Sequence, residues 1–459
     1  MRKNVSMTTV LIIGGGPGGY EAALVARQLG ADVTVVDRDG LGGSAVLTDV
    51  VPSKGLISVA DVLTGLRESE RLGIDTNAPI TVDLAQVNER LLRLAAAQSA
   101  DIQGRLERDG INIVRGTGSL KSDRQVEVAT ASGVELLEAD VILLATGARP
   151  RVLESAQPDG KRILTWEQLY DLDVLPEHLI VVGSGVTGAE FASAYHALGS
   201  AVTLVSSRDQ VLPGQDPDAA QVIQDVFVRR GISVMSSARA SSVVATDAGV
   251  VVTLADGRTV EGSHCLMAVG SLPNTESLGL ANASVATDAA GFITVDRVSR
   301  TSARGVYAAG DCTGVLMLAS TAAMQGRIAM WHALGDAVNP LDLNTVAANI
   351  FTDPEIASVG VTQAQIDAGE IEADVVMLPL KTNARAKMQE LEDGFIKLYC
   401  LPTNHTVVGG VIVAPRASEL IYSVALAVTH RLTAEDLAAT FTVYPSLSGS
   451  IAEAARRLH

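Results

Sequence analysis

Two groups of three glycines in this 459-residue chain have the spacing of nucleotide-binding turns, G-x-G-x-x-G. In such a turn the first glycine allows a tight bend, and the second lets the backbone approach a pyrophosphate. The third lets the following helix pack closely on the strand, with its N-terminus facing the phosphates. The spacing therefore predicts the binding of two dinucleotides. The six residues are Gly14, Gly16, Gly19, Gly183, Gly185 and Gly188.

The two turns belong to an internal repeat. LIIGGGPGGYEAALVARQLGADVTVVD begins at Leu11, and IVVGSGVTGAEFASAYHALGSAVTLVS begins at Ile180. The copies are offset by 169 positions, since 180 − 11 and 206 − 37 both give this value. Each copy reads as a buried strand, the glycine turn, an alanine-rich helix ending at a glycine, and a second strand. This order is typical of the βαβ unit of dinucleotide-binding domains and predicts an α/β fold.

The last residue of each copy distinguishes the two predicted ligands. A carboxylate at this place accepts hydrogen bonds from ribose hydroxyls and repels a 2′-phosphate. Asp37 in the first copy therefore favours an adenosine with free hydroxyls, as in FAD or NAD. The second copy has Ser206, Ser207 and Arg208, so that the carboxylate is missing and a cation follows two residues later. We expect NADPH there, with NADH still possible; the alternative is that Arg208 is a solvated loop charge.

The composition limits the other partners. A formal net charge of −17 leaves no broad cationic surface for nucleic acid or an anionic membrane, so we expect small molecules or a second copy as partners. The chain has no run of 18 apolar residues, and the apolar run near its start reads as a first strand rather than a secretory signal. We therefore expect a cytoplasmic protein. Cys265, Cys312 and Cys400 lack the spacing of a metal site or a disulfide framework.

Three further segments mark the remaining architecture. VILLATGARP reads as a strand that closes on a turn at Thr146 and Gly147, and GVYAAGDCTG as a strand that ends at Gly310 and Asp311. From about residue 346 the chain has strand-like and helical runs but no glycine motif, which predicts a separate α+β domain.

Along the chain the motifs follow in the order G-x-G-x-x-G, GG…PSK, ATG, the second G-x-G-x-x-G, GD and TDPE-x-A-x-VG. This order resembles the flavoprotein disulfide reductase family, which includes dihydrolipoamide dehydrogenase, glutathione reductase and mercuric reductase. The resemblance spans nearly the whole chain. It implies two Rossmann-like domains, one for FAD and one for NAD(P)H, and a C-terminal α+β dimerisation domain. The domains are expected at 1–155 with 276–345 (FAD), 156–275 (NAD(P)H) and 346–459 (dimerisation). It also implies a homodimer with the active site at the subunit boundary.

The same resemblance implies roles for individual residues. Lys54 corresponds to the family lysine near the flavin ring, and Glu190 corresponds to its ion-pair partner. Asp311 corresponds to the residue that binds the ribityl and pyrophosphate region of the flavin. The implied cofactor-binding residues are Gly14, Gly16, Gly19, Asp37, Gly43, Ser44, Lys54, Thr146, Gly147, Gly183, Gly185, Gly188, Ser206, Ser207, Arg208, Gly270, Gly310 and Asp311.

The segment GGSAVLTDVVPSK, which ends at Lys54, departs from the family pattern. Disulfide reductases carry a redox-active cysteine pair in this loop, and here Ala45 and Val50 stand at the two positions. Neither side chain forms a thiolate or a disulfide. The family's C-terminal signature H-P-T-x-S-E also differs, because Tyr444 stands in place of the histidine and Gly449 in place of the glutamate. The sequence therefore lacks both the redox-active cysteine pair and the histidine–glutamate pair that serves it in the family.

What remains is an enzyme that passes hydride from NAD(P)H to FAD and then electrons directly to an acceptor. Ala45, Val50 and Tyr444 from the partner would suit a flat, largely apolar acceptor that stacks on the flavin, such as a quinone. We therefore expect an NAD(P)H:quinone oxidoreductase with Lys54, Glu190 and Tyr444 as catalytic residues and no metal. The alternatives are a soluble pyridine nucleotide transhydrogenase, a flavin-binding scaffold with little catalysis and, more weakly, a lipoamide or glutathione reductase.

Overall fold

The computed structural model describes residues 7–74 and 80–458. Contacts divide the chain into two compact units. The first comprises Met1–Gly55, Asn88–Arg151 and Gly270–Leu341. The second comprises Leu56–Val87, Val152–Val269 and Asp342–His459.

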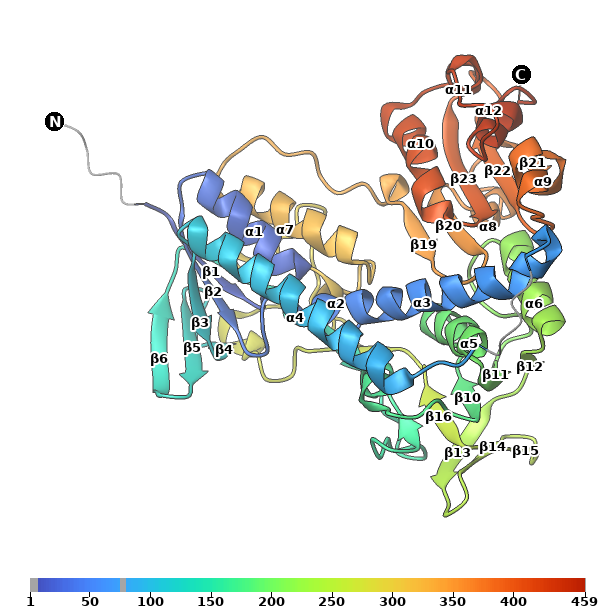
Figure 1. Cartoon of the computed structure of the whole chain (residues 1–459). Helices are drawn as coiled ribbons and strands as arrows, with labels where there is room; N and C mark the ends of the chain where they lie inside the picture. Colours follow the sequence, from blue (N-terminus) through green and yellow to red (C-terminus); the bar gives the residue numbers. More distant parts are fainter. Residues whose placement is uncertain (1–6, 75–79, 459) are drawn as a thin grey trace. The chain divides into compact units, whose positions relative to one another are not determined.

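The first unit is built on a five-stranded sheet in the order β18-β7-β1-β2-β3, in which all neighbours are parallel. Helices α1 and α7 lie side by side along it (Figure 1). A second, antiparallel sheet has the order β4-β5-β6, and a short antiparallel pair joins β8 to β17. The strands are β1 (Thr9–Ile13), β2 (Asp32–Asp37), β3 (Asn112–Arg115), β4 (Thr117–Leu120), β5 (Gln125–Thr130), β6 (Gly133–Glu138), β7 (Val141–Leu144), β8 (Ala148–Pro150), β17 (Ser271–Pro273) and β18 (Val306–Ala308).

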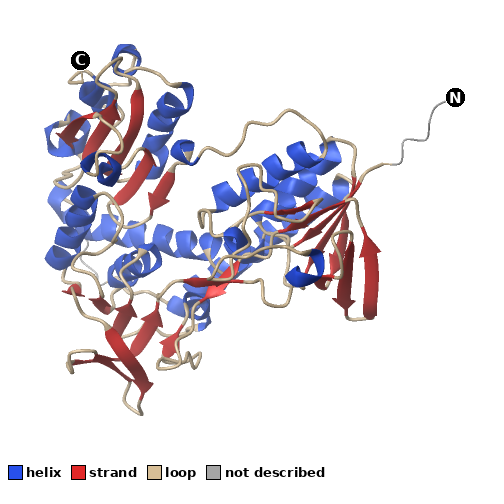
Figure 2. Cartoon of the chain, turned by 180° about the vertical axis from the view of Figure 1, so that it is seen from behind, coloured by secondary structure: helices blue, strands red, loops and turns tan. Residues whose placement is uncertain are grey.

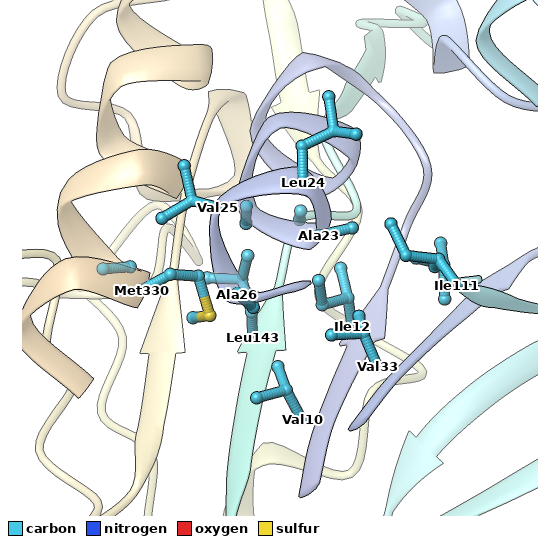
Figure 3. Close-up of a cluster of buried hydrophobic side chains, with 14 of the residues drawn as sticks. Val10, Ile12, Ala23, Leu24, Val25, Ala26, Val33, Ile111, Leu143 and Met330 are labelled. Carbon is cyan, nitrogen blue, oxygen red and sulfur yellow. The ribbon is translucent and has the colours of Figure 1, made fainter. Parts of the chain in front are cut away.

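Apolar side chains explain why this sheet and its helices form. Strand β1 has four of its five residues buried, as expected for a central parallel strand covered on both faces. Val10, Ile12 and Val33 form one buried cluster with the alanines of α1 and with Met330 of α7 (Figure 3). A Cβ added to Gly326 of α7 would lie 2.0 Å from the carbonyl oxygen of Gly18, so these two helices meet backbone to backbone. The helices of this unit are α1 (Pro17–Gln28), α2 (Gly43–Leu47), most of α4 (Leu84–Arg108) and α7 (Ala319–Ala333). Helix α3 (Val50–Glu68) begins in this unit, but most of its residues belong to the second unit.

The second unit contains a similar parallel sheet in the order β12-β11-β10-β16-β9. An antiparallel sheet of order β13-β14-β15 accompanies it, as β4-β5-β6 accompanies the first sheet. Its strands are β9 (Ile163–Leu164), β10 (His178–Val182), β11 (Ala201–Val205), β12 (Ser233–Met235), β13 (Ala240–Ala245), β14 (Val250–Leu254), β15 (Thr259–Gly262) and β16 (His264–Met267). Its helices are α5 (Val186–Leu198) and α6 (Pro217–Arg230).

The C-terminal part of the second unit is an antiparallel sheet of order β19-β20-β23-β22-β21 with helices packed on it (Figure 2). The buried Lys397 of β22 donates to Asp216 Oδ2 at 2.8 Å, and Tyr399 donates to the same oxygen at 3.0 Å. Asp216 is the N-cap of α6, so this cluster fastens the sheet to α6. The elements are β19 (Ala348–Ile350), β20 (Glu355–Gly360), β21 (Asp374–Pro379), β22 (Phe395–Cys400), β23 (Val407–Ala414), α8 (Gln363–Asp367), α9 (Ala384–Met388), α10 (Ala417–His430), α11 (Ala434–Ala439) and α12 (Gly449–Ala455).

The predicted fold class is confirmed: two Rossmann-like parallel sheets are followed by a C-terminal α+β region. The domain boundaries at 155, 275 and 345 stay a prediction. Among the described residues, no helix is both long and apolar enough to span a membrane, and no group of three or more acidic, histidine or cysteine side chains is placed to hold a metal. The short 3-10 helices are Ser69–Leu72, Trp166–Asp171, Leu280–Ala283, Asp311–Thr313, Leu343–Thr345 and Leu380–Thr382.

Candidate nucleotide-binding and redox site

The first glycine of each turn is required by the backbone. Gly14 has φ +105° and Gly183 has φ +111°, values that residues other than glycine rarely adopt. A Cβ on Gly14 would lie 2.2 Å from the carbonyl oxygen of Ala145, which follows β7. A Cβ on Gly183 would lie 2.1 Å from the carbonyl oxygen of Ala268, which follows β16. The two turns are therefore constrained in the same way.

The third glycine of each turn lets the helix approach. A Cβ on Gly19 would lie 1.9 Å from the carbonyl oxygen of Gly14, and a Cβ on Gly188 would lie 1.8 Å from that of Gly183. These contacts set α1 and α5 directly on the preceding turn, which explains why the motif requires a residue without a side chain there.

The middle glycines have the opposite environment. No heavy atom lies within 4 Å of a Cβ built on Gly16 or Gly185. Both are N-caps, of α1 and α5, and neither helix receives a hydrogen bond from a capping side chain. An open space beside an uncapped helix N-terminus suits a phosphate group. The residues present thus fit a pyrophosphate at each turn.

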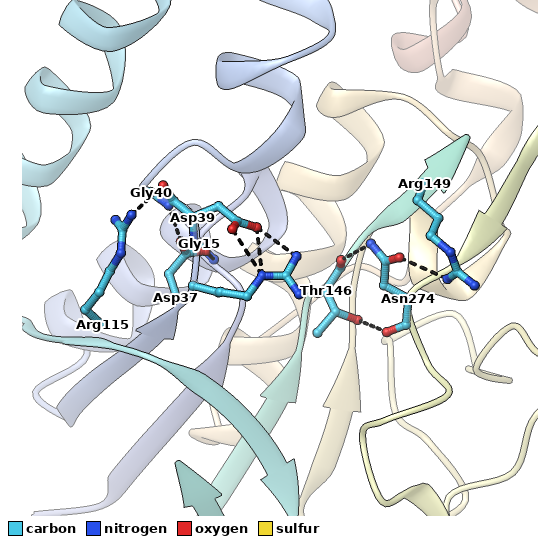
Figure 4. A network of polar contacts seen from close by, with 9 residues as sticks. Gly15, Asp37, Asp39, Gly40, Arg115, Thr146, Arg149 and Asn274 are labelled. Carbon is cyan, nitrogen blue, oxygen red and sulfur yellow. Dashed lines mark hydrogen bonds and ion pairs between the residues drawn. The ribbon is translucent and has the colours of Figure 1, made fainter. Parts of the chain in front are cut away.

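Asp37 organises the first nucleotide turn. Its Oδ2 accepts a hydrogen bond from Gly15 N at 2.7 Å, and its Oδ1 accepts from Asp39 N at 2.9 Å and Gly40 N at 2.6 Å (Figure 4). A carboxylate has about four acceptor positions, so one is left for a ribose hydroxyl. The side chain is 8% exposed, and the position fits the predicted adenosine of FAD.

Ser206 occupies the corresponding place in the second turn and is completely buried. Its hydroxyl lies 2.7 Å from the Ser184 hydroxyl, accepts from Arg208 N at 3.1 Å and lies 3.0 Å from Arg208 O, to which it donates. The hydroxyl is used within the turn, so Ser206 shapes the predicted site from behind. The neighbouring Ser207 and Arg208 are exposed.

The residues predicted to lie near the flavin are held by partners that the sequence did not predict. Gly310, with φ +81°, donates its N–H to Oε1 of the buried Gln325 at 2.8 Å. This bond fixes the turn that presents Asp311, whose carboxyl pKa is raised by burial. Gln325 comes from α7, which has no nucleotide motif, so only the tertiary structure identifies it.

Thr146 and Asn274 form a reciprocal pair between two distant segments. Thr146 Oγ1 donates to Asn274 O at 2.9 Å, and Asn274 Nδ2 donates to Thr146 O at 3.0 Å. Arg149 Nη1 adds a bond to Asn274 Oδ1 at 3.2 Å (Figure 4). The predicted Gly147 follows Thr146, whereas Gly270 lies at the other end of the β8–β17 pair, where its carbonyl oxygen accepts from Arg151 N at 2.9 Å. Their φ angles are +67° and +96°, with nothing within 4 Å of an added Cβ. Asn274 is a further residue that sequence motifs did not indicate.

The loop from Gly42 to Lys54 contains no sulfur. Ala45 lies in α2 together with the predicted cofactor residues Gly43 and Ser44, and Val50 begins α3. The three cysteines are buried elsewhere, and burial raises the pKa of the Cys265 thiol to about 12 and of the Cys312 and Cys400 thiols to about 11. Thiols with such pKa values are poor nucleophiles at neutral pH.

Lys54 and Glu190 belong to different compact units, so their predicted ion pair stays a prediction. Lys54 is half-buried near the start of α3. Glu190 is 4% exposed on α5, and its Oε1 accepts a hydrogen bond from Phe351 N at 2.8 Å. Phe351 immediately precedes the TDPE segment, and its role in holding this carboxylate was not predicted.

Tyr444 lies in an exposed apolar segment before α12. Its side chain is 85% exposed, and Phe441 and Val443 are 103% and 77% exposed. Gly449 begins α12. An exposed cluster of large apolar side chains is typical of a surface that a partner covers.

Comparisons with known proteins agree with this arrangement. The family model described as pyridine nucleotide-disulphide oxidoreductase matches residues 8–326, and its dimerisation-domain model matches residues 346–455. A protein of Mycobacterium tuberculosis named NAD(P)H dehydrogenase (quinone) is 56% identical, over 98% of this chain and 94% of its own length. A dihydrolipoyl dehydrogenase of Haloarcula marismortui is 35% identical, over 98% of this chain and 96% of its own length. The crystal structure of LpdA from Mycobacterium tuberculosis superposes with a TM-score of 0.95 at 56% identity, covering 99% of this chain and 100% of that one.

Proposed function

The chain belongs to the pyridine nucleotide-disulphide oxidoreductase family, whose members use FAD and NAD(P), and on this premise we propose that it is an NADPH:quinone oxidoreductase without a dithiol relay. The balanced reaction takes a hydride from NADPH and a proton from solvent and gives NADP⁺ and a hydroquinone. Bound FAD would supply the chemistry for hydride and electron transfer between the two substrates. The observation that carries the proposal is that Ala45 and Val50 stand where the family has its redox-active cysteines, while the three cysteines of the chain are all buried elsewhere.

The proposed roles follow the environment of each residue. The two glycine turns hold the pyrophosphates of FAD and the nicotinamide nucleotide, and Asp37 offers its remaining acceptor position to the FAD ribose. Lys54 supplies positive charge near the flavin, which favours the reduced, partly anionic ring. Glu190, fixed by Phe351 N, holds Lys54 in place. The FAD segments are proposed at 1–155 and 276–345, the nicotinamide segment at 156–275 and the dimerisation segment at 346–459.

The acceptor site is proposed to lie between two copies of the chain. Ala45 and Val50 offer an apolar surface beside the flavin, and Tyr444 of a second copy adds an aromatic ring. A quinone ring stacks well on such groups. Exposure of Phe441, Val443 and Tyr444 supports a homodimer that covers this segment. The name of the 56% identical relative also points to a quinone as acceptor.

Steady-state assays test the proposal. Purified protein should oxidise NADPH much faster with a water-soluble quinone than with buffer alone, and equal rates would contradict the proposal. A disulfide substrate such as lipoamide should give no turnover. Reduction of a thio-analogue of NAD by NADPH at the quinone rate would favour the transhydrogenase instead. A flavin that NADPH fails to bleach without oxygen would favour the scaffold.

A reductive titration tests whether the protein lacks a dithiol relay. With dithionite in the absence of oxygen, the protein should take up one electron pair per flavin. A second pair would show a redox-active protein group, and the direct route from flavin to acceptor would be wrong. The variant Val50→Cys alone should not change this count, because one thiol forms no intramolecular disulfide in the loop.

A further inference from the structure

Two arginines, one directly after the second repeat and one on the loop after β12, have guanidinium groups without a hydrogen bond or ion pair to any other residue in 7–74 and 80–458. These are Arg208 and Arg239, and both are exposed. The arginines at the first turn are occupied: Arg38 pairs with Asp39 at 2.9 Å, and Arg115 donates to Asp39 O at 2.8 Å. Cations without a partner are notable in a chain with a net charge of −17.

The backbone brings the two arginine segments together. Strands β11 and β12 are parallel neighbours, so that their carboxyl ends lie at the same edge of the sheet. Beyond that edge Ala238 N donates to Ser206 O at 2.7 Å, and Ser237 N donates to Arg208 O at 2.7 Å. Arg239 follows these bonds directly. The edge at which a dinucleotide's adenosine ribose lies therefore has Arg208 on one loop and Arg239 on the next.

Charge also favours an anion at this edge. The carboxylate that the first repeat has at Asp37 is replaced by the buried Ser206, which removes a repulsion. A phosphate monoester carries a charge of about −1.5 to −2 near pH 7 and accepts paired N–H bonds from guanidinium groups. Ser207 and Ser237 are exposed beside the arginines and offer hydroxyl donors. Asp209 is the anion in this turn, and no bond joins it to either guanidinium in the described part of the chain.

We propose that Arg208 and Arg239 together bind the 2′-phosphate of NADPH. This inference rests on the proposed nicotinamide site and adds to it a second arginine, on a loop that the glycine motif does not include. Arg239 distinguishes NADPH from NADH as much as Arg208 does, and the reaction with the acceptor does not involve it.

A binding experiment tests the pair without the reaction. Adenosine 2′,5′-bisphosphate and 5′-AMP are titrated into the FAD-loaded protein by calorimetry. Wild-type protein should bind the bisphosphate at least about tenfold more tightly, since each charged hydrogen-bonding group contributes a factor of that order. Arg208→Gln and Arg239→Gln should each remove most of the difference and leave 5′-AMP binding unchanged. Arg258→Gln, which loses a guanidinium already paired with Asp256, is the matched control.

Kinetics give the second measurement. Arg208→Gln and Arg239→Gln should each raise the KM for NADPH about tenfold and keep the KM for NADH within twofold of wild type. Added salt should raise the KM for NADPH less in these two variants than in wild type. An unchanged preference in Arg239→Gln would overturn the two-arginine site. If quinone reduction fails with both nucleotides while bisphosphate binding still depends on the arginines, the proposed function is wrong and the phosphate site stands.

Discussion

Asp37 and Ser206 occupy the same place in the two nucleotide-binding repeats, and both side chains organise the turn that follows. Asp39 N donates to Asp37 Oδ1 at 2.9 Å, and Arg208 N donates to Ser206 Oγ at 3.1 Å. The backbone bonds correspond as well, because Gly116 N donates to Asp37 O just as Ala238 N donates to Ser206 O. A hydroxyl thus replaces a carboxylate without loss of the turn. The repeats share their backbone geometry and differ in charge at this position, and we propose that this charge selects the ribose substituent.

The glycine turns give the largest expected effect. Gly14→Ala would force a positive φ and a 2.2 Å contact on a side chain, so we expect loss of bound FAD and of most soluble protein. Gly183→Ala should abolish nicotinamide nucleotide binding while FAD stays bound. Flavin absorbance after purification and nucleotide titration measure the two effects.

Gly16→Ala is the control for Gly14→Ala within the same turn. The added Cβ meets no heavy atom within 4 Å, and the φ of −68° suits alanine. The thermal stability of the FAD-free protein should stay unchanged, with FAD affinity reduced because the methyl group occupies the pyrophosphate space. A large loss of stability in this variant would contradict the difference between the first and middle glycines.

The contact of Lys397 in the C-terminal sheet with Asp216 at the start of α6 gives the next largest effect. Lys397→Met would leave Asp216 buried without its cation, and breaking such a pair costs about 3 to 5 kcal/mol. Urea denaturation followed by circular dichroism should show this loss in the free energy of unfolding. Lys381→Met, at an exposed position, should change stability little. Equal effects of the two variants would show that the cluster does not stabilise the unit.

A charge exchange tests the comparison directly. Ser206→Asp should raise the KM for NADPH by roughly 10-fold or more and spare NADH, because a carboxylate repels the 2′-phosphate. The first repeat shows what else is needed: a Cβ on Gly15 would lie 3.0 Å from Asp37 Oδ2, so a carboxylate requires glycine there. We therefore expect the cleanest shift from Ser184→Gly with Ser206→Asp. If this double variant still preferred NADPH, the charge at position 206 would not determine the choice between NADPH and NADH.

The sequence predicted these turns because each one is local. Spacing of glycines, strand periodicity and the residue at position 37 or 206 all fall within about 27 residues of one repeat. Asn274 and Phe351 were not predicted, since each binds a residue more than 100 positions away and carries no motif of its own. Gln325 was not predicted either: Gly310 is only 15 positions away, but Gln325 lies on a helix whose small residues indicate only packing. Arg239 was missed for a related reason, because only the pairing of β11 with β12 brings it to the turn.

The smallest expected effect is a pH dependence of stability that comes from Asp61, which lines a small cavity between α3 and α5. Its walls include Asp61, Asp353, Thr64 and Ser193. Burial raises the pKa of Asp61 to about 6, and the negative charges of Asp353 and Glu355 add to this shift. The positive charge of Arg416 opposes it. The folded chain therefore binds a proton more tightly than the unfolded chain, and stability falls as pH rises from about 4 to 6. Although its neighbours partly cover it, Asp61 still reaches solvent, and screening by water limits the loss to about 1 kcal/mol. Asp61→Asn should remove this pH dependence and raise the melting temperature slightly at pH 7.5, but not at pH 4. An unchanged difference between the two pH values in the variant would assign the titration to another group.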